Sequence, residues 1–411
     1  MTQAQSTLQQ ILSGAAWVSL YSGLYRFVTL LIAVFAARLL DVTGYGQVAI
    51  LQSTAALFIM FATLGMGTVA TKLIAEAEHR YLKSIYLVNF AFCLASSIAL
   101  FAGAGWIAEQ VYQDISLQNS IAYLALYTFL CGMSQVQTGV LAGREAYPLI
   151  AKINLMVGLL ALPLVYFSIA KWQVQGWLIS LILLELLKVV LLHIFIHTQF
   201  GGSKGQVTQE NLKAVLKLAL PIAVSGFFVL PVNWYVTREL LLASGYLEVA
   251  LLNISEQWIA ILTFFPIAIG NALLPMLAKQ GQAENKRNMS NLALKINALV
   301  ALAAGVPTLL LGDWVLSLYG DEYIQHSYLF FWLLPLVVVL ALTNQLNNRV
   351  IADSNANAMM YSNLVWLLVC LPLSVLLLDL ALGLVAVLLA RLAAYAAKLM
   401  FLFMVIRKGE S

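Results

Sequence analysis

The stretch "TGYGQVAIL", residues 43–51, returns in altered form as "SGYLEVALL" at residues 244–252. Gly-Tyr and Val-Ala occupy the same places in both copies, 201 residues apart. A second match follows in the same order. "NLMVGLLALP" at 154–163 and "NLVWLLVCLP" at 363–372 share an opening Asn-Leu and a closing proline, at an offset of 209. The shared order and similar offsets indicate that one sequence unit is used twice.

The composition identifies an integral membrane protein. Of the 411 residues, 62% are hydrophobic and only 10% are charged, whereas soluble domains carry about a quarter charged residues. The hydrophobic residues form runs of roughly 20 or more, the length that crosses the bilayer core as a helix. The three cysteines all lie in such runs, so no disulfide framework is expected.

Twelve apolar runs predict twelve transmembrane helices. They cover residues 12–38, 46–71, 84–108, 118–142, 148–170, 175–198, 213–240, 247–277, 290–312, 326–348, 358–378 and 381–405. Six spans per copy give both copies the same orientation, as in transporters built from parallel repeats. We therefore expect an all-α polytopic membrane protein with two six-helix lobes, residues 1–203 and 204–411. Substrates of such proteins bind where the lobes meet.

The charges in the loops predict the orientation. With the N-terminus inside, fifteen Lys and Arg residues fall in inner loops and at the C-terminus. Only Arg38, Lys171 and Arg238 fall in outer loops. This excess follows the positive-inside rule, so both termini are expected in the cytoplasm.

The first span carries a polar stripe with an arginine in it. Ser19, Ser22, Arg26 and Thr29 are spaced three or four residues apart, so they share one helix face. A charge within a span costs several kcal/mol and nearly always faces protein or water. We predict that Arg26 lines a central cavity as a substrate-binding cation. The alternative is a structural arginine held by helix carbonyls or by a carboxylate.

The eighth span carries a matching stripe. Asn253 and Glu256 lie three residues apart, and Gln257 flanks them. Asn253, Gln257 and, from the tenth span, Asn344 are predicted to line the same cavity. Glu256 is the candidate coupling or gating residue, which would pair with Arg26 in one state or carry a proton or sodium ion. A structural hydrogen-bonding role for Glu256 remains the alternative.

Three further charges lie inside spans of both halves. Glu185 and Lys188 are three residues apart on the sixth span, which favours a structural ion pair. Arg391 on the twelfth span falls within one residue of the repeat equivalent of Glu185. All three are predicted to be structural or cavity charges. Lys398 lies nearer the cytoplasmic end, where its chain is expected to extend toward the interface.

Other chemistries find little support. His193 and His197 have the spacing of some metal ligands, but no third ligand is near, so we expect no metal. The chain has no phosphate-binding P-loop and no glycine-rich dinucleotide turn, so no cofactor is expected. A membrane-embedded enzyme would need a large catalytic loop, and the longest loops have about a dozen residues. A major-facilitator transporter would carry a basic signature in the loop "TKLIAEAEHRYLK", which lacks it.

Prolines gather in the seventh and eighth spans. Pro221, Pro231, Pro266 and Pro275 each remove a backbone hydrogen bond, so these helices are expected to kink. Kinks of this kind suit a moving lobe, although static helices also carry them.

Two stretches resemble a known family. "AARLLDVTGYGQVAIL", residues 36–51, resembles the loop after the first span of Wzx-type polysaccharide flippases, although Asp41-Val42 replace the usual Gly-Pro. "GNALLPMLAKQ", residues 270–280, is similar to the end of their eighth span. The family belongs to the multidrug and oligosaccharidyl-lipid/polysaccharide exporter superfamily. The resemblance implies a MATE-like fold whose first, second, seventh and eighth spans border a central cavity.

The resemblance also implies a cargo and a location. Members move undecaprenyl-diphosphate-linked oligosaccharides across the bacterial inner membrane, for O-antigen or another surface polysaccharide. The polymerase and the chain-length regulator of that pathway are candidate partners, and we expect a monomer that binds membrane lipid and no nucleic acid. The alternative is a cation-coupled multidrug antiporter of the same fold. Drug exporters tend to carry a first-span aspartate, whereas this chain has Arg26, which favours an anionic cargo.

Overall fold

The computed structural model describes residues 23–24, 26–77, 80–200, 206–270, 283–353 and 355–410. Regular structure within these ranges is helical throughout, which confirms the predicted all-α class. Seven helices among them are long and apolar enough to cross a membrane, and a bent helix pair makes an eighth. The chain divides into two compact units, Met1–Trp234 and Tyr235–Ser411. The predicted boundary at residues 203 and 204 lies earlier, before α7.

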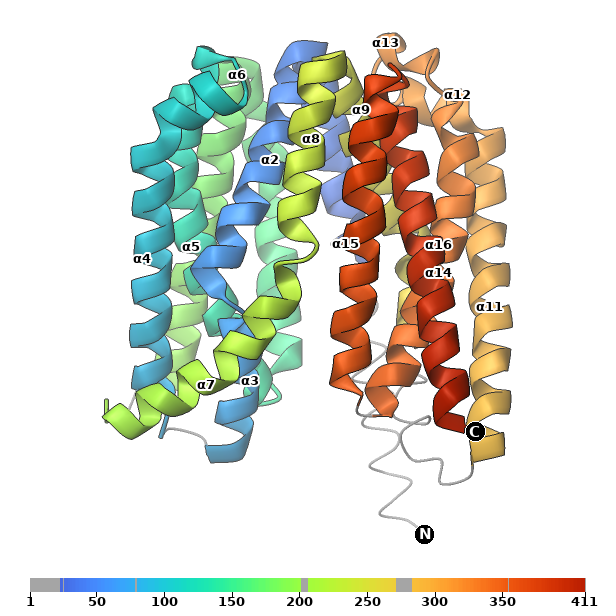
Figure 1. The fold of residues 1–411 in the computed structure, drawn as a ribbon. Helices are drawn as coiled ribbons and strands as arrows, with labels where there is room; N and C mark the ends of the chain where they lie inside the picture. The colour runs from blue at the N-terminus through green and yellow to red at the C-terminus, as the bar shows by residue number, and fades with distance from the viewer. Residues whose placement is uncertain are drawn as a thin grey trace. The chain divides into compact units, whose positions relative to one another are not determined.

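The first unit contains the helices of the first six predicted spans and most of the seventh (Figure 1). A helix covers residues 26–39. It is followed by α2 (Val42–Thr63), α3 (Met66–Ala77), α4 (Leu82–Trp106) with a π-helical turn (Ile107–Val111), a 3-10 turn (Ile115–Leu117), α5 (Gln118–Gly143), α6 (Tyr147–Phe200) and α7 (Gln209–Gly226). Helix α8 (Leu230–Ser244) begins in this unit and continues into the second.

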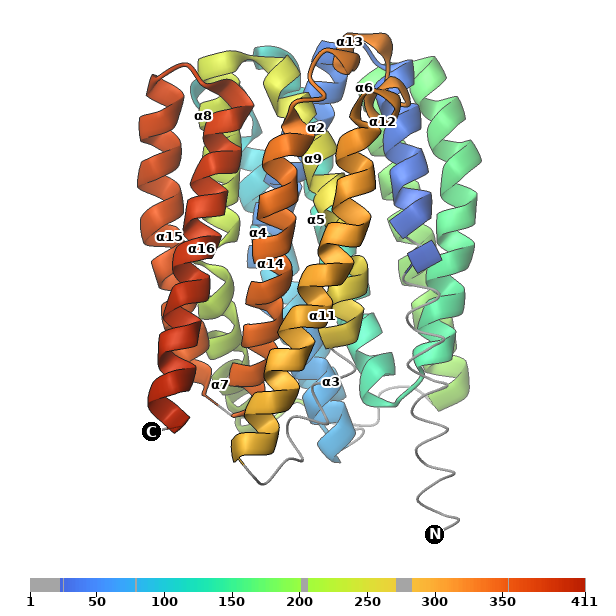
Figure 2. The same cartoon turned by 90° about the vertical axis from the view of Figure 1, so that its right-hand side faces the viewer.

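The second unit holds the remaining spans (Figure 2). Its helices are α9 (Tyr246–Leu262), the short helix Phe264–Gly270, α11 (Ala283–Leu310), α12 (Gly312–Ser317), α13 (Asp321–Ile324), α14 (Leu329–Ala352), α15 (Ala356–Asp379) and α16 (Gly383–Glu410). Pro275 and most of the predicted motif at 270–280 lie outside the described residues.

Several predicted spans are interrupted. The second span breaks at Leu64 and Gly65, which adopt the left-handed conformation and separate α2 from α3. Gln173, also left-handed, divides α6 into the predicted fifth and sixth spans. The seventh span breaks just before Pro231, between α7 and α8. The eighth bends by 41° between α9 and the short helix that carries Pro266. These two breaks are the kinks that the prolines predict.

Each unit is organised around its fourth span. Helix α5 packs against α2, α3, α4 and α6, and α14 packs against α9, α11, α15 and α16. Figure 2 shows α14 between α11 and α16. Asn89 on α4 donates to the carbonyl of Gly132 on α5 at 3.2 Å, and Asn297 on α11 donates to Gln345 on α14 at 3.1 Å. Asn89 and Asn297 are 208 residues apart, as are buried Gln137 and Gln345. These contacts support the internal duplication.

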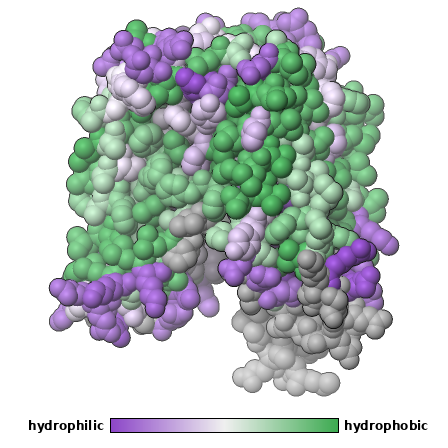
Figure 3. Space-filling view, viewed as in Figure 1, coloured by the Kyte–Doolittle hydropathy of each residue, from purple (hydrophilic) through white to green (hydrophobic). Residues whose placement is uncertain are grey.

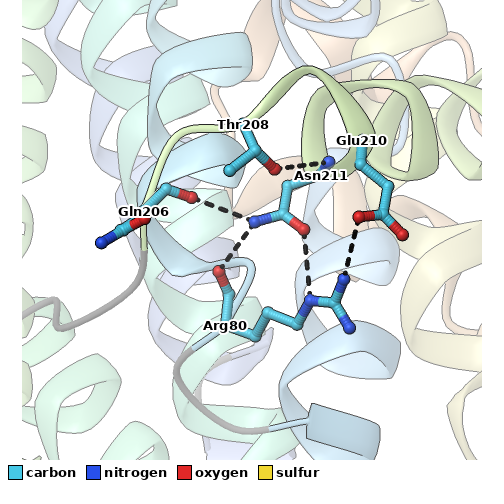
Figure 4. A network of polar contacts seen from close by, with 5 residues as sticks. All are labelled: Arg80, Gln206, Thr208, Glu210 and Asn211. Carbon is cyan, nitrogen blue, oxygen red and sulfur yellow. Dashed lines mark hydrogen bonds and ion pairs between the residues drawn. The ribbon is translucent and has the colours of Figure 1, made fainter.

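Helix α7 is fastened to the first unit at its N-terminal end (Figure 4). Buried Asn211 accepts a hydrogen bond from Arg80 Nε at 3.3 Å and donates to the Arg80 carbonyl at 3.4 Å and the Gln206 carbonyl at 3.0 Å. Thr208 Oγ1 accepts from the Asn211 amide at 3.2 Å, and Arg80 also lies 3.3 Å from the Glu210 carboxylate. The helix runs along the lower ends of α3 and α4 in Figure 1.

Apolar packing also holds α7 against α3 and α4. Val215 and Ala219 are buried in the apolar cluster that α3, α4, α5 and α6 share, whereas Lys213 and Lys217 are exposed. Apolar side chains cover the middle of the helices in both units, and hydrophilic side chains gather at the helix ends (Figure 3). This banding is the surface that a bilayer requires.

Candidate substrate-binding site

The predicted arginine of the first span is half-buried in the first unit. Arg26 lies one turn before Thr29, whose hydroxyl donates to the Arg26 carbonyl at 2.8 Å. This bond occupies the Thr29 hydroxyl, so Thr29 contributes an acceptor rather than a free donor to its surroundings. Between them, Val28 is buried, whereas Phe27 is 55% exposed on another face. Ser19 and Ser22 lie outside the described residues.

The charges of the sixth span form an ion pair. Lys188 Nζ lies 3.6 Å from Glu185 Oε1, and Ser134 on the neighbouring helix α5 donates to the same oxygen. Both charged side chains are mostly buried, at 23% and 14% exposure. Hydrogen bonds that satisfy the remaining lone pairs make a buried ion pair tolerable. The three side chains therefore form a compact neutral cluster between α5 and α6.

The strongest polar feature of the second unit is an ion pair between α9 and α16. Arg391 donates to the carboxylate of Glu256, and the side chain of Arg391 is 7% exposed while that of Glu256 is 48% exposed. The first turns of the same helices explain the alignment. Glu248 on α9 accepts from the backbone amide of Leu384 on α16 at 2.7 Å, and a carboxylate is favoured at a helix N-terminus.

This anchor fixes the register of the two helices. Glu256 lies eight residues after Glu248, and Arg391 lies seven residues after Leu384. Both intervals are about two helical turns. The contact between Glu248 and Leu384 therefore brings Glu256 and Arg391 to the same level of the two helices. Glu256 therefore has Arg391 as its partner in this structure. The buried guanidinium lies against a carboxylate that is about half exposed.

A polar seam joins α15 and α16 beyond this pair. Lys398 Nζ donates to Asn363 Oδ1 at 2.6 Å, and Lys398 is only 7% exposed. Trp366 and Tyr395 lie between this contact and Arg391, with ring centroids 5.7 Å apart. The prediction that Lys398 extends to the interface is wrong, because Asn363 gives its ammonium an acceptor inside the unit.

The predicted amide residues lie in the second unit. Gln257 accepts from the hydroxyl of Tyr319 at 3.3 Å, and Asn253 and Asn344 are half-buried. Tyr319 lies between α12 and α13, and its burial raises the pKa of the phenol, which stays a donor. Tyr319 has an equivalent in the first unit. Tyr112, 207 residues earlier, is bonded to Thr54 of α2 at 2.6 Å.

Sequence reasoning missed the buried asparagines and tyrosines that repeat between the units. Their signal is the offset of about 208 residues, which these single polar residues share with the repeated motifs. Among the described residues, no group of three His, Cys, Asp or Glu side chains is placed to hold a metal ion. His193 and His197 are exposed and stack on each other at 6.3 Å.

Known proteins resemble this chain in sequence. Residues 11–281 match the family described as "Polysaccharide biosynthesis protein". The EPS I polysaccharide export inner membrane protein EpsE of Ralstonia nicotianae is 21% identical over 323 residues, covering 72% of this chain and 71% of that protein. The EpsE protein of Ralstonia solanacearum is 30% identical over 119 residues, which span 28% of this chain and 27% of that protein.

Solved structures resemble it in fold. An inward-facing multidrug resistance MATE family transporter of the MOP superfamily superposes with a TM-score of 0.76 at 14% identity, over 94% of each chain. A MOP superfamily transporter from Pyrococcus furiosus, described as having a binding pocket of reverse polarity, gives 0.68 at 12% identity, over 97% of this chain and 95% of that one. These likenesses confirm the predicted MATE-like fold.

Proposed function

Since the chain belongs to the polysaccharide biosynthesis protein family, we propose that it is a flippase for undecaprenyl-diphosphate-linked oligosaccharide repeat units. It would carry them across the bacterial inner membrane by alternating access, for O-antigen or another surface polysaccharide. The family and the fold are those of transporters. The names of the Ralstonia relatives, which refer to polysaccharide export at the inner membrane, support this choice.

The observation that carries the cargo assignment is the buried cation of the second unit. Arg391 lies inside a predicted span, and its partner Glu256 is half exposed. A diphosphate offers paired oxygens that accept hydrogen bonds from the guanidinium, as the oxygens of a carboxylate do. An incoming diphosphate can therefore compete with Glu256 for Arg391. Burying that diphosphate without such a partner would cost tens of kcal/mol in the Born limit.

The polar residues divide into two roles under this proposal. Arg26 and Arg391 bind phosphate oxygens, while Thr29, Asn253, Gln257 and Asn344 offer hydrogen bonds to sugar hydroxyls. Glu256, once displaced from Arg391, is free to take a proton, which would couple transport to the proton gradient. The Glu185–Lys188 pair keeps its structural role because both of its charges are already satisfied.

The same contacts weigh against the alternative of a cation-coupled multidrug antiporter. An exporter of organic cations needs a carboxylate that is available to the drug. Glu185 is paired with Lys188, and Glu256 is paired with Arg391. In the described part of the chain, the two acids that favoured this alternative are therefore both neutralised by basic neighbours. The fold alone is compatible with either activity.

Two substitutions in each arginine test the proposal. In vesicles that contain the purified protein, flipping of a fluorescent lipid-diphosphate-linked oligosaccharide is expected to fall at least tenfold in Arg391→Gln. Arg391→Lys is expected to keep part of the activity, because it keeps the charge but not the fork. Arg26→Ala and Arg26→Lys are compared in a second assay, the ability of each variant to restore surface polysaccharide in cells that lack the protein. Arg26→Ala is expected to restore less polysaccharide than Arg26→Lys. Full function of the Gln and Ala variants at normal protein level would refute the anion-binding role.

A further inference from the structure

Lys398 is a further buried cation of the second unit, and it takes part in no ion pair with the residues that the structure describes. Lys398 is 7% exposed, and its contact in the described structure is one hydrogen bond, to the side-chain oxygen of Asn363. No acid lies within ion-pair distance of it among the described residues. An amide dipole compensates only part of the cost of burying a full charge. Lysines are almost never this buried unless they are paired.

A purely structural role does not account for this arrangement. The next turns of α16 place Leu399 and Leu402 in an apolar cluster with Leu346, Val350 and Ala358. An apolar side chain at position 398 would extend that cluster, and replacing buried charges by apolar groups is often neutral or stabilising. A charged residue retained inside a membrane span marks a functional site by default.

The position of Lys398 relative to Arg391 indicates what kind of ligand Lys398 could bind. The two residues are seven apart on α16, which is two turns and about 10.5 Å along one face. The Trp366–Tyr395 contact lies between them. The seam between α15 and α16 thus holds two cations, and one acid, Glu256, faces it from α9. The described side chains of the seam carry a net positive charge, which suits an anion.

We propose that Lys398 is a second binding residue for the anionic headgroup of the cargo. A phosphate oxygen accepts a hydrogen bond from the donors of the ammonium that Asn363 leaves unused. With the C-terminus in the cytoplasm, Lys398 lies on the cytoplasmic side of Arg391. The headgroup meets Lys398 first and then passes to Arg391, where it displaces Glu256. This inference rests on the proposed function, since it requires a diphosphate cargo.

Direct binding tests the inference. Purified protein in nanodiscs is titrated with undecaprenyl diphosphate, and inorganic pyrophosphate serves as the competitor. The charge is removed in Lys398→Gln and kept in Lys398→Arg. Asn363→Asp places a carboxylate beside the ammonium, so it fills the site from within. Arg407→Gln is the matched control, because it removes an exposed cation from the same helix. The thermal midpoint of every variant is recorded beside its affinity.

We expect Lys398→Gln and Asn363→Asp to weaken binding about tenfold to a hundredfold. Lys398→Arg is expected within about threefold of the wild type, and Arg407→Gln unchanged. Asn363→Asp is informative even where Lys398→Gln does not fold, because it adds an ion pair. If the wild-type protein binds and folded Lys398→Gln or Asn363→Asp binds with the same affinity, this inference is overturned and the proposed function is not. Wild-type protein that binds no diphosphate lipid would overturn the proposed function as well.

Discussion

The charge of Arg391 inside the second unit is compensated by Glu256. Removing one partner of a fully buried pair costs about 3–5 kcal/mol, since the other charge is left uncompensated. Glu256 is 48% exposed, so the pair is not fully buried and the cost is smaller. We predict that Glu256→Gln lowers the free energy of unfolding by about 1–2 kcal/mol. The thermal midpoint in detergent, without cargo, measures this.

A surface pair provides the control for that prediction. Lys72 and Glu76 lie 4.0 Å apart on α3, and both are more than half exposed. Glu76→Gln is expected to change stability by less than about 0.5 kcal/mol. The double variant Glu256→Gln/Arg391→Gln is expected to recover part of the loss, because it removes both charges of the pair and leaves neither without its partner. Equal effects of the two Gln substitutions would show that the buried pair contributes no more than the surface pair.

The residues of this site were predictable in kind but not in pairing. Periodicity placed Arg26 on a polar face and marked Glu256 and Arg391 as charges within spans. Which acid meets which base depends on how α9 packs on α16, and those helices are separated by more than a hundred residues. Glu185 and Lys188 were the exception, because their spacing of three residues on one helix brings them together locally.

Helix α7 is the last complete helix of the first unit before α8 enters the second, and its contacts indicate where the chain bends. Asn211 and Arg80 bind its start to the loop after α3, while Val215 and Ala219 bury its apolar face in the first unit. The chain then breaks between α7 and α8. We predict that α7 moves with the first unit and that bending occurs at this break.

Cross-linking tests this prediction. Arg80→Cys and Glu210→Cys are combined in a background that lacks the three native cysteines and joined by a short bifunctional thiol reagent. We expect the cross-linked protein to retain at least half of its flipping activity, because both positions stay in one moving body. Each single-cysteine variant treated with a monofunctional reagent is the control. Loss of activity only on cross-linking would place α7 with the second half, as the predicted boundary at 203 and 204 has it.

The elements show which breaks a sequence reveals. Pro231 and Pro266 predicted the interruptions of the seventh and eighth spans, because proline lacks the backbone N–H that a helical hydrogen bond requires. The break at Leu64 and Gly65 has no proline, and an apolar run passes through it, so hydropathy alone predicted one helix over 46–71. Leu64 and Gly65 adopt positive φ values there, which a hydropathy pattern does not register.

At the scale of the whole molecule, duplication and charge have different consequences. The repeat gives each unit a fourth span at its centre and an equivalent buried asparagine, which explains why the fold could be predicted from short motifs. The charges do not repeat. Within its spans the first unit holds Arg26 and the neutral Glu185–Lys188 pair, whereas the second holds Arg391 and Lys398 with one acid, Glu256, which leaves that group with a net positive charge. The function therefore follows from what the copies do not share.

That net charge, with the expected orientation, leads to a prediction about the driving force. Moving one charge through the membrane potential is worth about 2.3 kcal/mol per 100 mV, so an inside-negative potential favours outward movement of a diphosphate. We predict that flipping in vesicles clamped at different potentials responds by about tenfold per transported charge for roughly 60 mV. Collapsing the pH gradient is expected to remove only the share of transport that proton binding to Glu256 drives. In Glu256→Gln, collapsing the gradient is expected to have no effect. Transport that ignores voltage and stops when the pH gradient collapses would contradict the prediction and make Glu256, rather than the potential on the cargo, the source of the driving force.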